Sequence, residues 1–163
     1  MEAQLSPLVL LDFAIINSIF KFIAPPENVE VQKLVSEYLI DIDFAIIQEE
    51  DGARVFVKSA INQGETESPG YSIFAEGVAI LELSKTATLT EKDRKALLQY
   101  SAVSIALNSL RGFISSLTAN APFGKYILPS IDVNNLFQQK AKAGQNLPQN
   151  KRGSKRSSRS TNS

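Results

Sequence analysis

Residues 37–60 read EYLIDIDFAIIQEEDGARVFVKSA, and this stretch determines the expected fold. Apolar residues occupy every second position from Ile40 to Ile46 and alternate with aspartates, which is the period of a half-buried β-strand. The EEDG sequence that follows is typical of a turn, and Gly52 at its end is able to adopt positive φ. A second run of strand-forming residues comes next. We therefore predict a β-hairpin from Tyr38 to Ile61.

One further strand is expected on each side of this hairpin. The upstream run LVLLDFAIINSIFKFIAP, from Leu8 to Pro25, is rich in β-branched and aromatic residues. Downstream, the loop GETESPG leads into YSIFAEGVAILEL at residues 71–83. Gly77 inside that run indicates a bulge or a close approach of another backbone. The first half of the chain thus predicts four sequential strands in an antiparallel sheet.

The second half of the chain has the periodicity of a long helix. Thr88-x-x-Glu91 has the pattern of a capping box at its start. Apolar residues then recur at spacings of four and three from Ala96 to Leu117, with a second apolar row beside them. Either this is one wide stripe covering a monomeric core, or the helix also contacts a second subunit. The second reading places the following residues at an oligomer interface: Tyr100, Val103, Leu107, Leu110, Arg111 and Ile114.

An apolar connection containing two prolines, APFGKYILPS, follows the long helix. Residues from Ile131 to about Ala143 then predict a short amphipathic helix. From residue 144 the sequence is polar and of low complexity, which predicts disorder. The expected organisation is an α+β domain over residues 1–143, with a four-stranded antiparallel sheet, a long helix and a short C-terminal helix. A disordered basic, Ser-rich tail over 144–163 completes it.

The composition excludes several kinds of active site. The chain of 163 residues has no Cys and no His, so thiol nucleophiles, imidazole bases and Cys/His zinc sites are ruled out. No glycine-rich phosphate loop or G-x-S-x-G motif occurs. The carboxylates at 49–51 are explained by a turn, and Asp41 and Asp43 by a strand face. We therefore expect no enzyme activity, no cofactor and no metal.

Neither of the two most apolar segments reads as a membrane span. Leu8 to Phe22 is interrupted by Asp12 and Asn17, and Tyr100 to Asn120 contains five serines. The expected location is the cytoplasm.

The order strand, hairpin, strand, long helix, proline loop and short helix resembles the SecB family of preprotein-export chaperones. The most similar part is LNSLRGFISSLTANAPFGKYILPSIDVNNLF, and KFIAP at residues 21–25 is similar to the end of the family's first strand. The resemblance spans roughly residues 10 to 140. The matching positions in the longer segment are Arg111, Phe123, Leu128, Pro129, Asp132, Leu136 and Phe137.

The resemblance implies an ATP-independent holdase chaperone that binds unfolded polypeptides in hydrophobic grooves. It also implies a homotetramer, a dimer of dimers whose long helices lie between two eight-stranded sheets. The proline loop would line part of each groove and would lose little freedom on binding. Each aromatic or apolar residue there has the alternative of packing into the core. The expected client-binding residues are Phe22, Phe123, Tyr126, Ile127, Leu128 and Phe137.

Two departures from the family bear on its partners. Where the family's first strand would carry acids for contact with the SecA motor, this chain has Ile19 and Ile23, which argues against SecA. The tail is also basic: seven Lys or Arg and no acid occur from Gln139 onward. The alternative functions are a dedicated chaperone of one partner, such as an antitoxin, and nucleic-acid contact through the tail. The tail has no aromatic residue for base stacking, which disfavours the latter.

Overall fold

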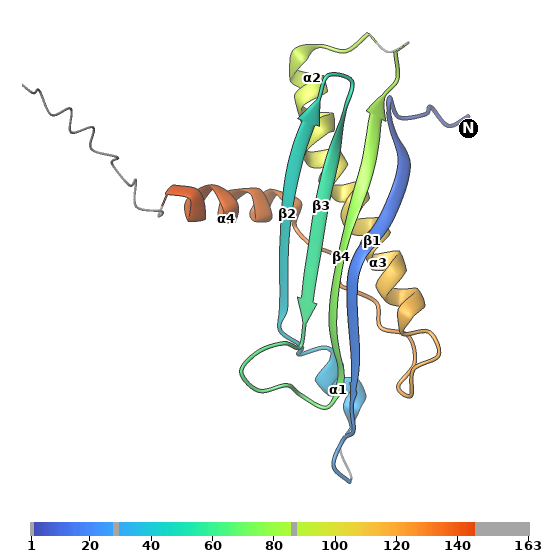
Figure 1. Cartoon of the computed structure of the whole chain (residues 1–163), viewed down its shortest axis with the longest axis vertical. Coiled ribbons are helices and arrows are strands. Elements are labelled where there is room, and N and C mark those ends of the chain that lie inside the picture. The colour runs from blue at the N-terminus through green and yellow to red at the C-terminus, as the bar shows by residue number, and fades with distance from the viewer. Residues whose placement is uncertain (1, 28–29, 86–87, 146–163) are drawn as a thin grey trace, which may run out of the picture. The chain divides into compact units, whose positions relative to one another are not determined.

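The structure, a computed structural model, describes residues 2–27, 30–85 and 88–145 (Figure 1). The chain divides into two compact units, residues 1–133 and 134–163, which are described separately here. Most of α4 belongs to the second unit, and the tail predicted to be disordered lies outside the described residues from 146 onward. The elements are β1 (Leu8–Ile23), α1 (Val31–Val35), β2 (Ile40–Glu49), β3 (Gly52–Ile61), β4 (Gly70–Leu83), α2 (Glu91–Ala96), the π-helix η1 (Leu97–Ser101), α3 (Ala102–Leu117) and α4 (Val133–Gln145).

The four strands form one antiparallel sheet in the order β1-β4-β3-β2. The consecutive strands β2, β3 and β4 are neighbours, and β1 returns to pair with β4, which is the strand order of a Greek key. The predicted sheet of four antiparallel strands is confirmed, including the hairpin from Tyr38 to Ile61. Strands β1 and β2 lie at the two edges.

One face of this sheet packs against α3, which runs along it (Figure 1). Alternate residues of β3 and β4 are buried on that face, as their period of two requires. The long apolar row of α3 is buried against them. The core of the first unit is thus a helix on a sheet, and its largest fully buried side chains include Val55, Val57, Ile61, Tyr71, Ile73, Val103, Leu110 and Ile114.

Two strand glycines are explained by close packing. A Cβ atom on Gly77 would lie 2.6 Å from the ring of Phe13, and the β1–β4 register shifts beside it between Ile15 and Asn17. That Cβ would also lie 3.0 Å from the carbonyl oxygen of Ala14, so the expected close approach of another backbone is confirmed, whereas the extra residue of the register shift lies in the partner strand β1 and not at Gly77. The expectation for Gly52 was wrong in its cause: its φ is not positive, but a Cβ there would lie 2.2 Å from the carbonyl oxygen of Leu81.

The long helix differs from its predicted form at its N-terminal end. Thr90, and not Thr88, is the N-cap, and its side chain accepts a hydrogen bond from the Asp93 amide at 3.1 Å. The π-helix η1 then follows, with more residues per turn than an α-helix, and this changes the phase of the apolar row. Tyr100, which lies in η1, is 42% exposed in the single chain, and its predicted role at an oligomer interface stays a prediction. No helix within the described residues is long and apolar enough to cross a membrane.

Candidate functional site

Four aromatic side chains gather where β1 ends, β4 begins and the loop after α3 passes. We call them the aromatic cluster: Phe20, Phe22, Tyr71 and Phe123. The Tyr71 ring lies 5.5 Å from Phe20 and 6.1 Å from Phe123, and Phe123 lies 5.5 Å from Phe22, centroid to centroid. All three pairs are tilted, within the range in which aromatic rings attract each other.

The strands determine which members of the cluster are exposed. Phe22 pairs with Tyr71 across the β1–β4 ladder, and Phe20 pairs with Ile73, so both phenyl groups lie on the helix-covered face. Because β1 is an edge strand, Phe20 and Phe22 remain 36% and 40% exposed. Tyr71, on the central strand β4, is 1% exposed. The cluster therefore has a buried tyrosine at its base and partly exposed phenyl groups around it.

A tight turn presents Phe123. The amide of Gly124 donates to the carbonyl of Ala121 at 2.8 Å, closing a four-residue turn with Pro122 and Phe123 at its two central positions. Proline is favoured at the second position of such a turn, because its φ is already fixed. Gly124 has a φ of +77°, a conformation that a side chain would strain.

Three side chains hold the loop that contains this turn. The Tyr71 hydroxyl donates to the carbonyl of Gly124 at 2.9 Å and accepts from the amide of Phe123 at 2.7 Å. The hydroxyl of Thr118 accepts from the amide of Tyr126 at 2.8 Å. The guanidinium of Arg111 donates to the carbonyls of Leu128 and Pro129 at 2.8 and 2.9 Å. The loop is thus held at its start, middle and end, and its shape is determined by side chains of the sheet and of the long helix region.

Burial keeps two tyrosine hydroxyls neutral: that of Tyr71 in the cluster and that of Tyr126 on the same loop as Phe123. Burial raises the pKa of Tyr71, and the hydrogen bond from the Phe123 amide opposes this only in part. Burial also raises the pKa of Tyr126 to about 12. The nearest ion pair joins Lys21 to Glu67, and hydrogen bonds from Lys21 and Ser72 lower the pKa of the Glu67 carboxyl. At neutral pH the tyrosine hydroxyls therefore remain protonated and able to donate.

The structure brings together only part of the predicted client-binding set. Phe22 and Phe123 meet in the aromatic cluster, and Ile127 is 61% exposed on the same loop. Tyr126 and Leu128 are buried within the first unit instead. Phe137 lies in α4, in the second unit, and is described apart from the cluster. The client-binding role of all six residues stays a prediction.

The predicted interface residues are placed as follows. Val103, Leu107, Leu110 and Ile114 are buried within this chain, so their apolar character is explained without a second subunit. Arg111 donates hydrogen bonds to backbone carbonyl groups of its own chain. Their role at an interface between chains stays a prediction.

Sequence reasoning missed the residues that organise the site. Tyr71 and Thr118 carry no local signal, because their partners lie 52 and 8 residues away in the sequence. Phe20 belongs to the strand Leu8–Ile23, whose apolar and polar residues do not alternate regularly, so periodicity does not tell which of its side chains are buried. Only the alignment of β1 with β4, which is a long-range property, identifies Phe20 and Tyr71 as neighbours.

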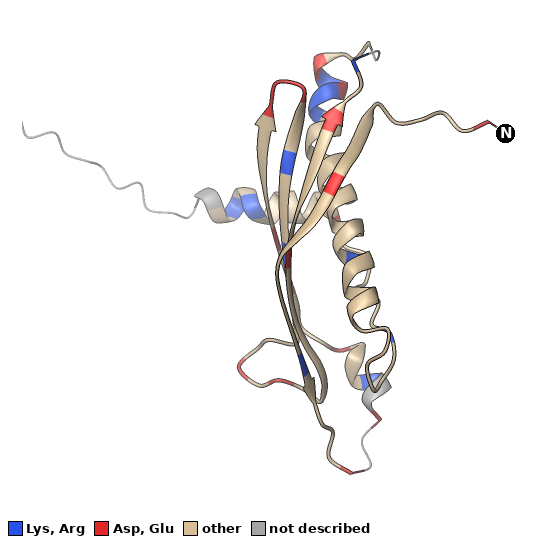
Figure 2. Ribbon diagram, turned by 45° about the vertical axis from the view of Figure 1, so that its right-hand side comes forward, with Lys and Arg blue, Asp and Glu red and all other residues tan. Residues whose placement is uncertain are grey.

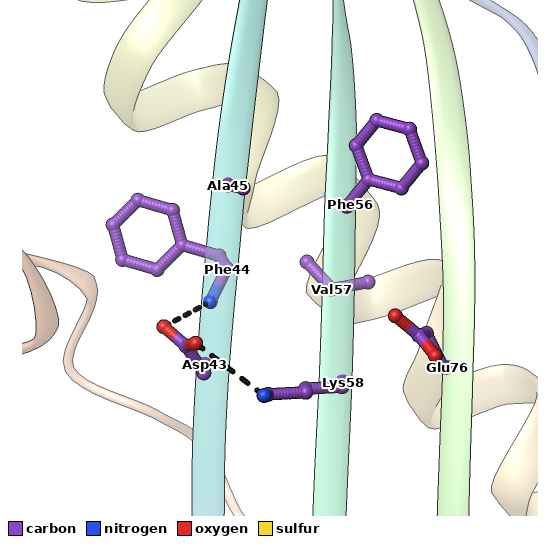
Figure 3. A pocket seen from close by; sticks show the side chains of 7 residues that line it. All are labelled: Asp43, Phe44, Ala45, Phe56, Val57, Lys58 and Glu76. Carbon is purple, nitrogen blue, oxygen red and sulfur yellow. Dashed lines mark hydrogen bonds and ion pairs between the residues drawn. The ribbon is translucent and has the colours of Figure 1, made fainter.

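A small hollow of about 150 Å³ lies on the opposite face of the sheet (Figure 3). There Lys58 lies between Asp43 on β2 and Glu76 on β4, with 3.6 Å between the Lys58 ammonium and an Asp43 carboxylate oxygen. Ala45 and Phe56 line the same hollow. No group of acidic residues within the described part of the chain is arranged to hold a metal ion.

The acidic turn at residues 49–51 is accompanied by basic side chains, as Figure 2 shows for the turn and α2. Arg54 donates to the carboxylate of Glu49 at 2.6 Å, and Arg94 of α2 donates to the carbonyl of Glu50. The first contact lies within the hairpin, and the second joins the β2–β3 turn to α2 at the start of the helix. The carboxylates at this turn therefore have a structural explanation.

Comparison with solved structures finds the same fold in a known chaperone. The SecB-like chaperone Rv1957 of Mycobacterium tuberculosis, in complex with a ChAD peptide from the Rv1956 HigA1 antitoxin, superposes with a TM-score of 0.50. The match covers 77% of this chain and 91% of that chain at 13% identity. Similarity at this identity concerns the fold alone, and it supports a SecB-like α+β fold here.

A protein of unknown function from Streptococcus agalactiae also matches, with a TM-score of 0.43, 6% identity, and coverage of 76% of this chain and 97% of that one. This weaker likeness carries no argument. No protein-family model matches the sequence, and no curated protein matches it.

Proposed function

We propose that this protein is a chaperone that binds unfolded segments of other polypeptides, without ATP, at the aromatic cluster. The observation that carries the proposal is a pair of partly exposed phenyl groups whose ring centroids lie 5.5 Å apart. Phe22 belongs to the edge strand β1, and Phe123 belongs to the loop after α3. The SecB-like fold and the complex of Rv1957 with an antitoxin peptide support a polypeptide ligand. The proposed setting is the cytoplasm, as the family resemblance implies.

The chemistry of the cluster suits unfolded chains. An unfolded polypeptide exposes apolar side chains, and each one that leaves water on an aromatic surface is stabilised by roughly 25 cal/mol per Å² of buried apolar area. Phenyl groups accept many side-chain shapes, so such a surface selects apolar character more than sequence. The anchored loop limits the entropy lost when a client binds.

A second candidate is a chaperone dedicated to one partner. It is favoured by the neighbouring structure, whose bound peptide comes from an antitoxin. It also agrees with Ile19 on β1, where the export chaperones would carry an acid for SecA. We therefore place export through SecA below a dedicated partner among the possible roles.

The first test measures suppression of aggregation. Guanidine-denatured citrate synthase is diluted into buffer without ATP, and light scattering is followed with increasing amounts of this protein. We expect suppression by the wild-type chain. Phe123→Ala should require about tenfold more protein for the same effect, because a phenyl group contributes roughly 1.5–3 kcal/mol when it is fully buried.

Phe56→Ala is the matched control. Phe56 is also half-buried, but it extends from the opposite face of the sheet (Figure 3). This variant should suppress aggregation as well as the wild type does. Equal loss in both variants would contradict the assignment of binding to the aromatic cluster. No suppression by the wild-type chain would contradict a general holdase and favour the dedicated partner.

A further inference from the structure

Two tyrosine hydroxyls connect three separate segments of the first unit. The Tyr38 hydroxyl donates to the carbonyl of Pro69 at 2.8 Å and accepts from the backbone amide of Tyr71 at 2.9 Å. The Tyr71 hydroxyl then donates to Gly124 and accepts from Phe123, two successive residues of the turn. Each hydroxyl thus acts once as a donor and once as an acceptor.

We infer that Tyr71 is a positioning residue for polypeptide binding, and that its hydroxyl holds the turn in the shape that presents Phe123 beside Phe22. The inference rests on the proposed function. Tyr71 is buried, so it acts through Phe123 and does not itself contact a client. Its role is to fix a phenyl group that the turn alone would leave free to move.

The geometry separates the hydroxyl from the ring. The Tyr71 ring packs between Phe20 and Phe123, and a phenylalanine would retain that packing. Loss of the hydroxyl would leave the Phe123 amide and the Gly124 carbonyl without their side-chain partner, so the turn would open more often. The i to i+3 hydrogen bond from Gly124 to Ala121 would remain as the only backbone bond within the turn that the structure describes.

The decisive variants are Tyr71→Phe and Tyr38→Phe, which remove the same atom from two buried tyrosines. Each loses two hydrogen bonds, but only Tyr71→Phe loses bonds to the turn that carries Phe123. The probe is fluorescein-labelled, reduced and carboxymethylated lactalbumin, which stays unfolded. A single hydrogen bond corresponds to a factor of roughly two to twelve in an equilibrium constant. We expect Tyr71→Phe to weaken binding of this probe about threefold or more, and Tyr38→Phe to leave it unchanged.

Hydrogen exchange provides a readout that does not depend on binding. In the unliganded protein, the Phe123 amide should exchange about tenfold faster in Tyr71→Phe than in the wild type or in Tyr38→Phe. A double-mutant cycle tests whether Tyr71 acts through Phe123. In the Phe123→Ala background, Tyr71→Phe should have no additional effect on probe affinity.

The outcomes separate this inference from the proposed function. Wild-type binding that is equally weakened by Tyr71→Phe and Tyr38→Phe would mean that both hydroxyls serve stability alone, and would overturn the inference. Additive effects of Tyr71→Phe and Phe123→Ala would overturn it as well. A wild-type chain that does not bind the probe, although its Phe123 amide is protected, would refute the proposed function and with it the binding role of Tyr71.

Discussion

Tyr126 differs from the other two buried tyrosines at the level of a single atom. Its hydroxyl is buried and has no hydrogen-bond partner within the part of the chain that the structure describes. A buried polar group without a partner costs about 1–3 kcal/mol, so removing it should not destabilise the fold. We predict that Tyr126→Phe leaves the free energy of unfolding unchanged or raises it by about 1 kcal/mol, measured by urea denaturation at pH 7.

The same residue predicts how stability depends on alkaline pH. Burial raises the pKa of Tyr126 to about 12, whereas an unfolded tyrosine ionises near 10. The unfolded state therefore releases its proton first. Titration of this group therefore leaves the free energy of unfolding unaffected below pH 10 and lowers it as the pH rises toward 12. Melting temperatures between pH 8 and 12 should fall less steeply in Tyr126→Phe than in the wild type, and equal slopes would contradict this account.

At the scale of the helix, α3 offers two positions with opposite expectations. Leu110 is fully buried against the sheet, and Leu110→Ala should cost about 2–5 kcal/mol of unfolding free energy. Gly112 is exposed, and a Cβ atom there would meet nothing within 4 Å. Gly112→Ala should stabilise by about 1 kcal/mol through helix propensity. Both values follow from urea denaturation, and a loss at Leu110 below about 1 kcal/mol would contradict the helix-on-sheet core.

The elements also show how far the sequence alone leads. Alternation at Ile40–Ile46 is local, and so it predicted the hairpin correctly. The runs of β-branched and aromatic residues on either side of it predicted the other two strands. The start of the long helix was wrong by two residues, because Thr88 and Thr90 both suit an N-cap and only the fold selects one. The π-helix at Leu97–Ser101 has no sequence signal that periodicity detects. The aromatic cluster was found in part, because Phe123 is conspicuous in its loop whereas Tyr71 depends on strand pairing.

At the scale of the whole molecule, apolar side chains are concentrated on the edge strand β1. Exposed edge strands in natural proteins usually carry charges or are covered, because their backbone and side chains invite association. β1 does contain two register shifts, which disrupt regular pairing. Its apolar surface nonetheless agrees with the assembly of several chains that the family resemblance implies. The exposed large apolar residues on β1 are Val9, Leu10, Leu11, Ile16, Ile19, Phe20 and Phe22.

The homotetramer that the family resemblance implies leads to a prediction about the mass of the assembly, which is separate from any effect on folding. In a dimer of dimers whose long helices meet, the exposed face of α3 at Gly112 would lie in the contact between chains. The wild type should sediment near 71 kDa, four times the 17.8 kDa of the chain. Gly112→Gln adds a long side chain at an exposed position, without disturbing the core. It should therefore shift the mass toward a dimer without unfolding the individual chains.

Gly112→Ala is the control for this experiment, because its single methyl group should leave the assembly intact. Analytical ultracentrifugation measures all three masses at the same chain concentration. A wild-type chain that sediments as a monomer would contradict the tetramer, and the apolar surface of β1 would then require another partner. A tetramer that Gly112→Gln leaves unchanged would place the contact elsewhere. The β1 edge would then be the next surface to test, with Leu11→Lys, since that side chain is exposed at a register shift and a lysine there needs no space in the core.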